Sequence, residues 1–371
     1  LRDAQRMKTP SVGTAEQERK LVELSADILA LTSEAAVLIR RGRIAYANPS
    51  AQAILGQDCT GKTVAAIFGA DIAGAQAPSF IASATIGEKP FIVRVSRMNE
   101  GNVIFFTRPE PVPAILNDPF LCSMRSGLMN IGMSSERLRE QAEEHGDNAA
   151  LTALSSLMRS YFRLVRVTAN ASLVLAMSGD GFAFCPCRLN LSNFLITMTE
   201  AVEDLIPYPA VTVNHGEDIC LAADPTLIRQ LLLNLISNCL VHAEGCSRIS
   251  ISLTDAGENV ILSVSDDGKG IEPEQLPTVF DRYRHSFEPS RMGAGPGLGL
   301  MVVRGIAEKH GGTLLLESRP GQGTTVRVSL GKHLSTDAEL HSPGMSSCLR
   351  EVLVGLSDKL PAECYTEKYM D

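Results

Sequence analysis

The feature that most constrains the fold is an apolar helical run with polar side chains on one face. Asp224-Pro225 predicts the helix start, because Asp is favoured as N-cap and Pro at the first helical position; LIRQLLLNLISNCLVHA follows. Asn234 and Asn238 lie four residues apart in this run, and His242 follows four residues later. A buried polar group without a partner costs about 1–3 kcal/mol. The face therefore needs neighbouring backbone, a ligand or a metal as its partner.

Three glycine-bearing segments follow this helix. A predicted strand, ENVILSVS, leads into DDGKG at 266–270, a pattern that suits a turn bringing backbone close to a planar ligand. GPGLGL at 295–300 then opens the predicted helix LMVVRGIAEKH, and glycine-rich backbone at a helix N-terminus offers amide donors to phosphate. Finally, HGGTLLLESRPGQGTTVRVSL predicts a strand, a glycine turn and another strand. Each pattern taken alone also fits an ordinary turn.

In order and spacing, these segments resemble the ATP-binding domain shared by sensor histidine kinases, gyrase B, Hsp90 and MutL, the GHKL superfamily, and specifically its histidine kinase version. The resemblance covers 185–331 and implies a GHKL-type α/β sandwich that binds ATP and Mg²⁺. It implies that Asp266 accepts the adenine amino group, that Asn238 ligates Mg²⁺, and that 281–296 forms a mobile lid. Val241 departs from the family pattern, because the family usually has a basic residue three positions after the Mg²⁺-binding Asn. This substitution implies weaker contacts with the phosphates. The residues implied in ATP binding are Asn234, Asn238, His242, Asp266, Gly268, Gly270, Phe280, Tyr283, Gly295, Gly297, Leu298, Gly299 and Thr324.

The N-terminal part has a different pattern. After an N-terminal helix or tail at 1–21, AAVLIRRGRIAYANPSAQAILG predicts strand, turn, strand and short helix, and PFIVRVSRMNEGNVIFFTR predicts two strands. The motif GRIAYANPSAQAILG resembles a PAS sensor domain, expected at 22–110, with a Pro-rich linker after it. Cys59 resembles the flavin-reactive cysteine of a light-sensing subclass, but Asp58 replaces the usual Asn and nothing after Cys59 matches. We expect an ordinary packed or surface thiol there.

A helical hairpin is expected at 114–180. Asp118-Pro119 predicts the start of the first helix, the EEHGDN turn at 143–148 ends it, and a second periodic run continues to Gly179. Two antiparallel helices cannot bury so long an apolar seam alone, so we expect a homodimer through 118–178 that forms a four-helix bundle. The seam residues are Leu121, Met124, Leu128, Ile131, Leu138, Leu154, Leu157, Tyr161 and Leu164.

This hairpin resembles the dimerisation and phosphotransfer hairpin of the same kinases, with one large exception. Aligning RSGL at 125–128 with the family's Arg-Thr-Pro-Leu places Cys122 at the position of the acceptor His and Ser123 at the acidic position. Phosphorylation of an imidazole needs the imidazole, and the adjacent Glu normally assists by proton transfer. Their loss argues against autophosphorylation on this chain.

Composition limits the partners. Lys+Arg 34 against Asp+Glu 42 leaves a net charge of −8, which disfavours direct nucleic-acid binding. No uncharged apolar window reaches the roughly 18 residues of a membrane span. Nine scattered cysteines favour reduced thiols in a cytoplasm.

The C-terminal extension, 332–371, carries an amphipathic run, CLREVLVGLSDKL, that can dock on this chain or on a partner.

The sequence thus predicts an α+β multidomain, cytoplasmic sensor histidine kinase homologue of a bacterial two-component system, coupling a PAS sensor to a domain that binds ATP and Mg²⁺. Three functions stay open. The chain could phosphorylate another protein, act as a pseudokinase scaffold for a response regulator or partner kinase, or work as a GHKL ATPase machine. Asn234 stands where the last class has a Glu general base, which argues against it.

Overall fold

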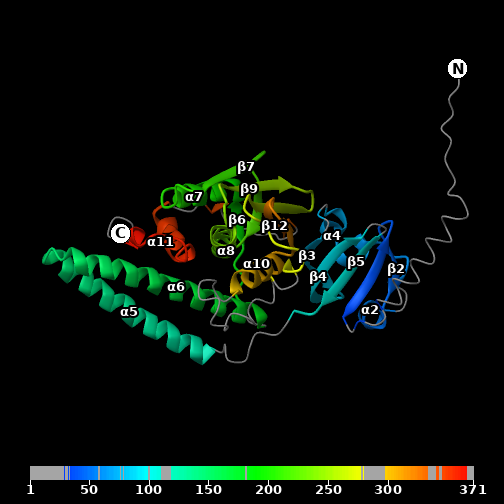
Figure 1. Cartoon of the computed structure of the whole chain (residues 1–371), viewed down its shortest axis with the longest axis horizontal. Coiled ribbons are helices and arrows are strands. Elements are labelled where there is room, and N and C mark those ends of the chain that lie inside the picture. The colour runs from blue at the N-terminus through cyan, green and yellow to red at the C-terminus, as the bar shows by residue number, and fades with distance from the viewer. Residues whose placement is uncertain are drawn as a thin grey trace, which may run out of the picture. The chain divides into compact units, whose positions relative to one another are not determined.

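A computed structural model of the chain divides into two compact units, Leu1–Pro109 and Glu110–Asp371 (Figure 1). Both units are mixed α/β structures. The N-terminal helix or tail expected at 1–21, the expected lid at 281–296, Phe280, Tyr283 and Gly295 lie outside the described residues. The structure describes residues 29, 32, 34–56, 59–75, 77, 79–98, 101–109, 118–179, 182–276, 279, 297–332, 340–341 and 345–365.

The first unit contains an antiparallel sheet. Its strands follow the order β2 (Arg43–Ala47), β1 (Ala35–Arg40), β5 (Gly101–Thr107), β4 (Lys89–Met98) and β3 (Ser79–Ile86). Three short helices accompany it, α2 (Pro49–Leu55), α3 (Val64–Phe68) and α4 (Ala70–Gly74). The predicted strand–turn–strand–helix order at 35–55 and the two later strands are confirmed. The Phe106 ring packs edge-on against Phe68 and Phe91 in the core.

Asn48 organises the start of this sheet. Its Oδ1 accepts hydrogen bonds from the backbone N–H of Ala36 at 3.0 Å and of Ala51 at 2.9 Å, so it caps α2 and ties that helix to β1. Its Nδ2 donates to three carbonyl oxygens, those of Leu29, Thr32 and Glu34. These bonds satisfy a fully buried amide. Cys59 is also buried, so it is a packed thiol.

The second unit starts with an antiparallel helical hairpin. Helices α5 (Asp118–Glu144) and α6 (Asn148–Ser178) flank the predicted turn, and α6 ends before Gly179 as expected. The two helices approach closely at Gly132, where an added Cβ would lie 2.7 Å from Tyr161 Oη. The predicted seam is buried only in part: Leu121 and Leu128 are buried, whereas other members are exposed, namely Met124, Ile131, Leu138, Leu157 and Leu164.

The hairpin is followed by a sheet with helices on one face. The strand order is β7 (Ala210–His215), β9 (Arg248–Asp255), β10 (Asn259–Asp266), β12 (Gly323–Gly331) and β11 (Leu314–Arg319); β7 and β9 are parallel and the other pairs antiparallel. Alternate residues of β10 are buried because α7 (Leu191–Glu203), α8 (Pro225–His242) and α10 (Leu298–Lys309) pack on that face. A small second sheet contains β13 (Leu340–His341), β6 (Cys187–Asn190) and β8 (Cys220–Ala223).

Local signals set the start of α8. Asp224 Oδ1 accepts from the N–H groups of Thr226 and Leu227, and Pro225 occupies the first turn, as predicted. The backbone N–H of Asp224 donates to Nε2 of buried His310 at 3.1 Å, and His310 Nδ1 lies 2.8 Å from the Ile306 carbonyl oxygen. His310 is therefore neutral, with its proton on Nδ1.

The C-terminal extension packs on the same unit. It contains α11 (Met345–Gly355) and the short helix η4 (Ala362–Tyr365), which contact α6, α7 and α8 (Figure 1). Asp358 pairs with Arg163 and Arg166 of α6, and the Tyr365 ring stacks on Phe162 with centroids 5.3 Å apart. Among the described residues, no helix combines the length and apolar character that a membrane crossing requires.

Candidate functional site

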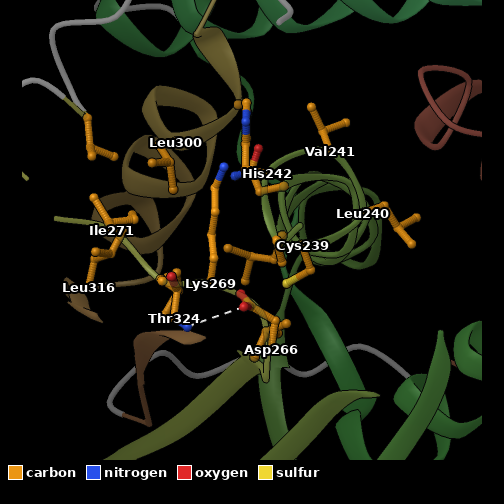
Figure 2. Close-up of a pocket in the computed structure, with 18 of the residues that line it drawn as sticks. Cys239, Leu240, Val241, His242, Asp266, Lys269, Ile271, Leu300, Leu316 and Thr324 are labelled. Atoms are coloured by element: carbon orange, nitrogen blue, oxygen red, sulfur yellow. Dashed lines mark hydrogen bonds between the residues drawn. The ribbon is translucent and has the colours of Figure 1, made fainter. Parts of the chain in front are cut away.

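A cavity of about 480 Å³ opens beside the C-terminal half of α8. The end of β10, the turn after it, the first residues of α10 and strands β11 and β12 form its other walls. Figure 2 shows Asp266 and Thr324 at one end, with His242 and Leu300 further along the cavity. Apolar side chains occupy much of the lining, namely Leu235, Val264, Val279, Ile271, Leu316 and Val326.

Asp266 is the last residue of β10 and is held from two sides. One carboxylate oxygen, Oδ1, accepts from the N–H of Gly268 at 3.0 Å and from the N–H of Thr324 at 3.3 Å (Figure 2). Burial raises the pKa of this carboxyl group, and the two backbone donors oppose that effect. Both donors bind Oδ1, so the second carboxylate oxygen can accept from a ligand.

Two glycines allow the backbone to close around Asp266. Gly323 has φ +83°, and an added Cβ would lie 1.9 Å from the Asp266 carbonyl oxygen. Gly270 has φ +69°, and a Cβ there would lie 2.1 Å from the Arg319 carbonyl oxygen. Both positions require glycine for conformation and for space. The predicted turn after β10 therefore does bring backbone segments into close contact.

The neighbouring acidic residue has another role. Asp267 accepts from the backbone N–H of Ser247 at 2.7 Å and of Arg248 at 3.0 Å, and from the Ser247 hydroxyl at 2.5 Å. These bonds, first that of the Ser247 hydroxyl, hold the pKa of Asp267 far below its usual value. Asp267 thus ties the turn to the start of β9, whereas Asp266 faces the cavity.

Cys239 lies next to Asp266 (Figure 2). Burial, followed by the charge of Asp266, raises the pKa of its thiol well above the usual value. The side chain is thus a protonated thiol that donates toward the carboxylate, and it does not act as a nucleophile at neutral pH.

The other end of the cavity is formed by Gly297 and Gly299 at the start of α10, which are called the glycine turn below. Gly297 has φ +72° and caps the helix without any side-chain hydrogen bond, so the first amides of α10 are left for other acceptors. A Cβ on Gly299 would lie 3.1 Å from Asn234 Oδ1 and 3.5 Å from Asn238 Oδ1, which places both amides next to the turn. The permanently cationic residues among the described lining are Lys269, which pairs with Glu244 at 2.8 Å, and Lys359 of the C-terminal extension.

Asn234 is placed differently from its neighbour Asn238. Asn238 lines the cavity, but Asn234 does not; it is 1% exposed and accepts from Asn170 Nδ2 of α6 at 2.9 Å. The sequence reasoning missed Asn170 and Lys359. No local signal pointed to either residue, because Asn170 stands between Thr168 and Ser172 on α6 and Lys359 lies in the C-terminal extension.

The structure brings most of the predicted residues to the cavity. Leu298 is an exception, because it packs against Leu121 and Ala171 of the hairpin, and Gly268 packs against Ala243. Cys122 and Ser123 are exposed on α5, directly after Leu121. The predicted residues that line the cavity are Asn238, His242, Asp266, Gly270, Gly297, Gly299 and Thr324.

Comparison with known proteins agrees with this geometry. Residues 223–333 match the family described as histidine kinase-, DNA gyrase B-, and HSP90-like ATPase. The chain is 40% identical over 121 residues to the sensor-like histidine kinase SenX3 of Mycobacterium bovis, covering 32% of this chain and 30% of SenX3. It is 35% identical over 186 residues to the sensor protein KdpD of Escherichia coli, covering 50% of this chain and 21% of KdpD.

Part of the chain also aligns with a solved structure. The catalytic domain of histidine kinase ThkA aligns with a TM-score of 0.34 and 27% identity, covering 40% of this chain and 96% of that domain. The chain spans less than a third of the length of SenX3 and KdpD. Residues 223–333 therefore match the histidine kinase-, DNA gyrase B- and HSP90-like ATPase family, in a chain that is similar over part of its length to sensor histidine kinases.

Proposed function

We propose that this chain is a two-component signalling protein that binds ATP and Mg²⁺ in the cavity beside α8 and couples a PAS-like sensor at 22–110 to that site. The observation that carries the proposal is the pairing of a buried carboxylate, Asp266, with a glycine turn that opens α10. One end of the cavity thus suits an adenine amino group and the other suits phosphates.

Adenine recognition follows from the surroundings of Asp266. The exocyclic amino group would donate to Asp266 Oδ2, while the Gly268 and Thr324 amides hold Oδ1. The apolar side chains of Ile271 and Leu316 border the same space and would cover the base (Figure 2). At the opposite end, the uncapped amides of α10 would bind phosphate oxygens, assisted by His242 and Lys359.

The described residues fit Mg²⁺ as a nucleotide-bound ion. They include no group of three or more His, Cys, Asp or Glu side chains placed to hold a metal by themselves. Mg²⁺ is commonly bound by one or two protein oxygens together with substrate phosphates. Asn238 Oδ1 would supply such an oxygen beside the glycine turn, and the ion would neutralise phosphate charge.

The hairpin at 114–180 would form a homodimer through residues 118–178. Large apolar side chains remain exposed along both helices, including Met124, Ile131 and Leu138 on α5 and Leu157 and Leu164 on α6. These are members of the seam that the sequence predicts. A second copy of the hairpin would bury them in a four-helix bundle.

Phosphoryl transfer to a separate protein is the activity we favour. Leu121 packs in one cluster with Leu298 at the start of α10, and Cys122 and Ser123 follow it on the exposed face of α5. Neither is an imidazole. The phosphoryl acceptor would therefore be a His or Ser of another protein, such as a partner kinase. A scaffold that binds ATP without transfer is the second candidate, favoured by Val241, which lines the cavity without a charge.

The test combines intact-mass spectrometry of the full chain after incubation with ATP and Mg²⁺ with calorimetry of nucleotide binding. We expect ATP to bind, Asp266→Asn to remove binding, and the chain's mass to stay unchanged. A lysate protein that becomes labelled when the chain and radiolabelled ATP are added would show kinase activity toward another protein. Loss of that label with Asn238→Ala would show that the activity comes from this chain and not from enzymes of the lysate. A wild-type chain that does not bind ATP would refute the proposal.

A further inference from the structure

Three amide side chains join the helical hairpin to the helix that lines the cavity. Asn170 of α6 donates from Nδ2 to Asn234 Oδ1 at 2.9 Å. Its Oδ1 accepts from Gln230 Nε2 at 2.6 Å and from Asn234 Nδ2 at 3.3 Å. Asn170 is 4% exposed and Asn234 1% exposed. A buried amide group without a partner costs about 1–3 kcal/mol, and the partner of Asn234 Oδ1 is Asn170 Nδ2.

This cluster lies beside the glycine turn. A Cβ on Gly299 would lie 3.1 Å from Asn234 Oδ1, the same oxygen that accepts from Asn170. Helix α6 also reaches α10 directly, because Ala171 packs against Leu298. One helix of the hairpin is thereby in contact with both helices that carry the phosphate end of the cavity.

We infer that Asn170 is a positioning residue for the phosphate end of the nucleotide site, through which the hairpin sets the affinity for ATP. The inference rests on the proposed function, since it requires a nucleotide in the cavity. Asn170 fixes the amide of Asn234, and that amide limits how far the backbone at Gly299 can move. The turn then keeps the first amides of α10 directed at the phosphates.

The adenine end is supported independently. Asp266 is held by the Gly268 and Thr324 amides, and neither belongs to the amide cluster. Loss of Asn170 should therefore affect ligands with phosphates and spare a ligand without them. A general loss of folded protein would reduce both equally, which separates positioning from structural support.

The experiment measures calorimetric binding of ATP and of adenosine to the full chain. Asn170→Ala is expected to weaken ATP binding about tenfold, as expected for a lost buried hydrogen-bond network, and to leave adenosine affinity within about twofold. Adding Asn170→Ala to Asn234→Ala should cost clearly less than the sum of the two single losses, because the two residues share two hydrogen bonds. Ser172→Ala is the matched control on α6, since its hydroxyl donates to the Thr168 carbonyl oxygen of its own helix at 2.8 Å.

Three outcomes would overturn the inference: ATP affinity unchanged in Asn170→Ala, equal losses for ATP and adenosine, or fully additive losses in the double variant. A wild-type chain that binds neither ligand would instead refute the proposed function. Wild-type binding combined with a selective loss for ATP supports both.

Discussion

The ion pairs of Asp358 predict a large and local effect of one substitution. Asp358 reaches α6 from the C-terminal extension, pairing with Arg163 Nε at 2.8 Å and with Arg166. The side chains of Arg166 and Asp358 are 10% and 11% exposed. Burial lowers the pKa of Arg166, and the charge of Asp358 opposes that shift. Asp358→Ala would leave a buried guanidinium without its counter-charge.

Breaking a buried pair from one side costs about 3–5 kcal/mol. Arg163 is 43% exposed and adds little, because water screens its charge. At roughly 2–4 °C per kcal/mol for a unit of this size, Asp358→Ala should lower the unfolding midpoint by about 10 °C. Replacing both partners, Arg166→Met with Asp358→Leu, should recover most of this loss, because no charge remains buried.

The assay is thermal unfolding by circular dichroism, with hydrogen exchange of α11 as a local measure. Exchange in α11 should accelerate in Asp358→Ala and return toward the wild-type rate in the double replacement. Asp255→Asn, which removes an exposed partner of Lys332, is the control and should leave the midpoint unchanged. An Asp358→Ala chain with wild-type midpoint and wild-type exchange in α11 would refute the reasoning.

Four further predictions follow from single sites. Because burial raises the pKa of Asp266, ATP binding should weaken on acidification at a higher pH than the usual pKa of Asp would give, as isothermal calorimetry can measure. Asp266→Asn should remove ATP binding without lowering the midpoint of thermal unfolding at pH 7. Burial lowers the pKa of His310 below its usual 6.5. The stability that neutral His310 contributes is therefore fully present above pH 6.5 and is lost as the pH falls through the lowered pKa. The urea midpoint of unfolding should decline between pH 8 and about 5, and it should decline less in His310→Gln. Gly323→Ala should cost about 3 kcal/mol or more from the clash with Asp266, whereas Gly321→Ala, with φ +72° and no atom within 4 Å, should cost only about 1 kcal/mol in urea unfolding. Lys359→Ala should weaken ATP binding several-fold at low salt and less at high salt, with Lys62→Ala unchanged.

Local signals in the sequence were sufficient for the helix and strand boundaries that matter to the site. The Asp224-Pro225 cap, the end of β10 at Asp266 and the strand pair β11–β12 are found where the sequence predicts them. Each depends on residues a few positions apart, and such patterns can be recognised without knowing the fold. Glycine positions were also informative, because φ above zero at Gly270 and Gly323 excludes most other residues.

Contacts between distant segments could not be predicted in this way. Asn170 and Asn234 are 64 residues apart, and Arg166 and Asp358 are 192 apart. The sequence correctly indicated that Asn234 needs a partner, but left open whether backbone or a ligand supplies it. In the structure, the partners of Asn234 are the Gln230 carbonyl oxygen and the Asn170 side chain. Asn234 therefore makes contacts within the protein, whereas Asn238 on the same helix face lines the cavity.

The polar contacts of α6 explain why the hairpin and the ATPase domain should respond to each other. Arg166 binds the C-terminal extension at one level of the helix, and Asn170, one turn further on, binds α8. Both side chains are buried, so a rotation of α6 that breaks either contact leaves an unpaired charge or amide in the protein interior. Because such states cost several kcal/mol, α6 is expected to move together with α8 and the extension rather than slide past them. In the proposed function, a signal that reorients the hairpin would act on the phosphate end of the cavity through Asn170, because its partner Asn234 lies beside Gly299.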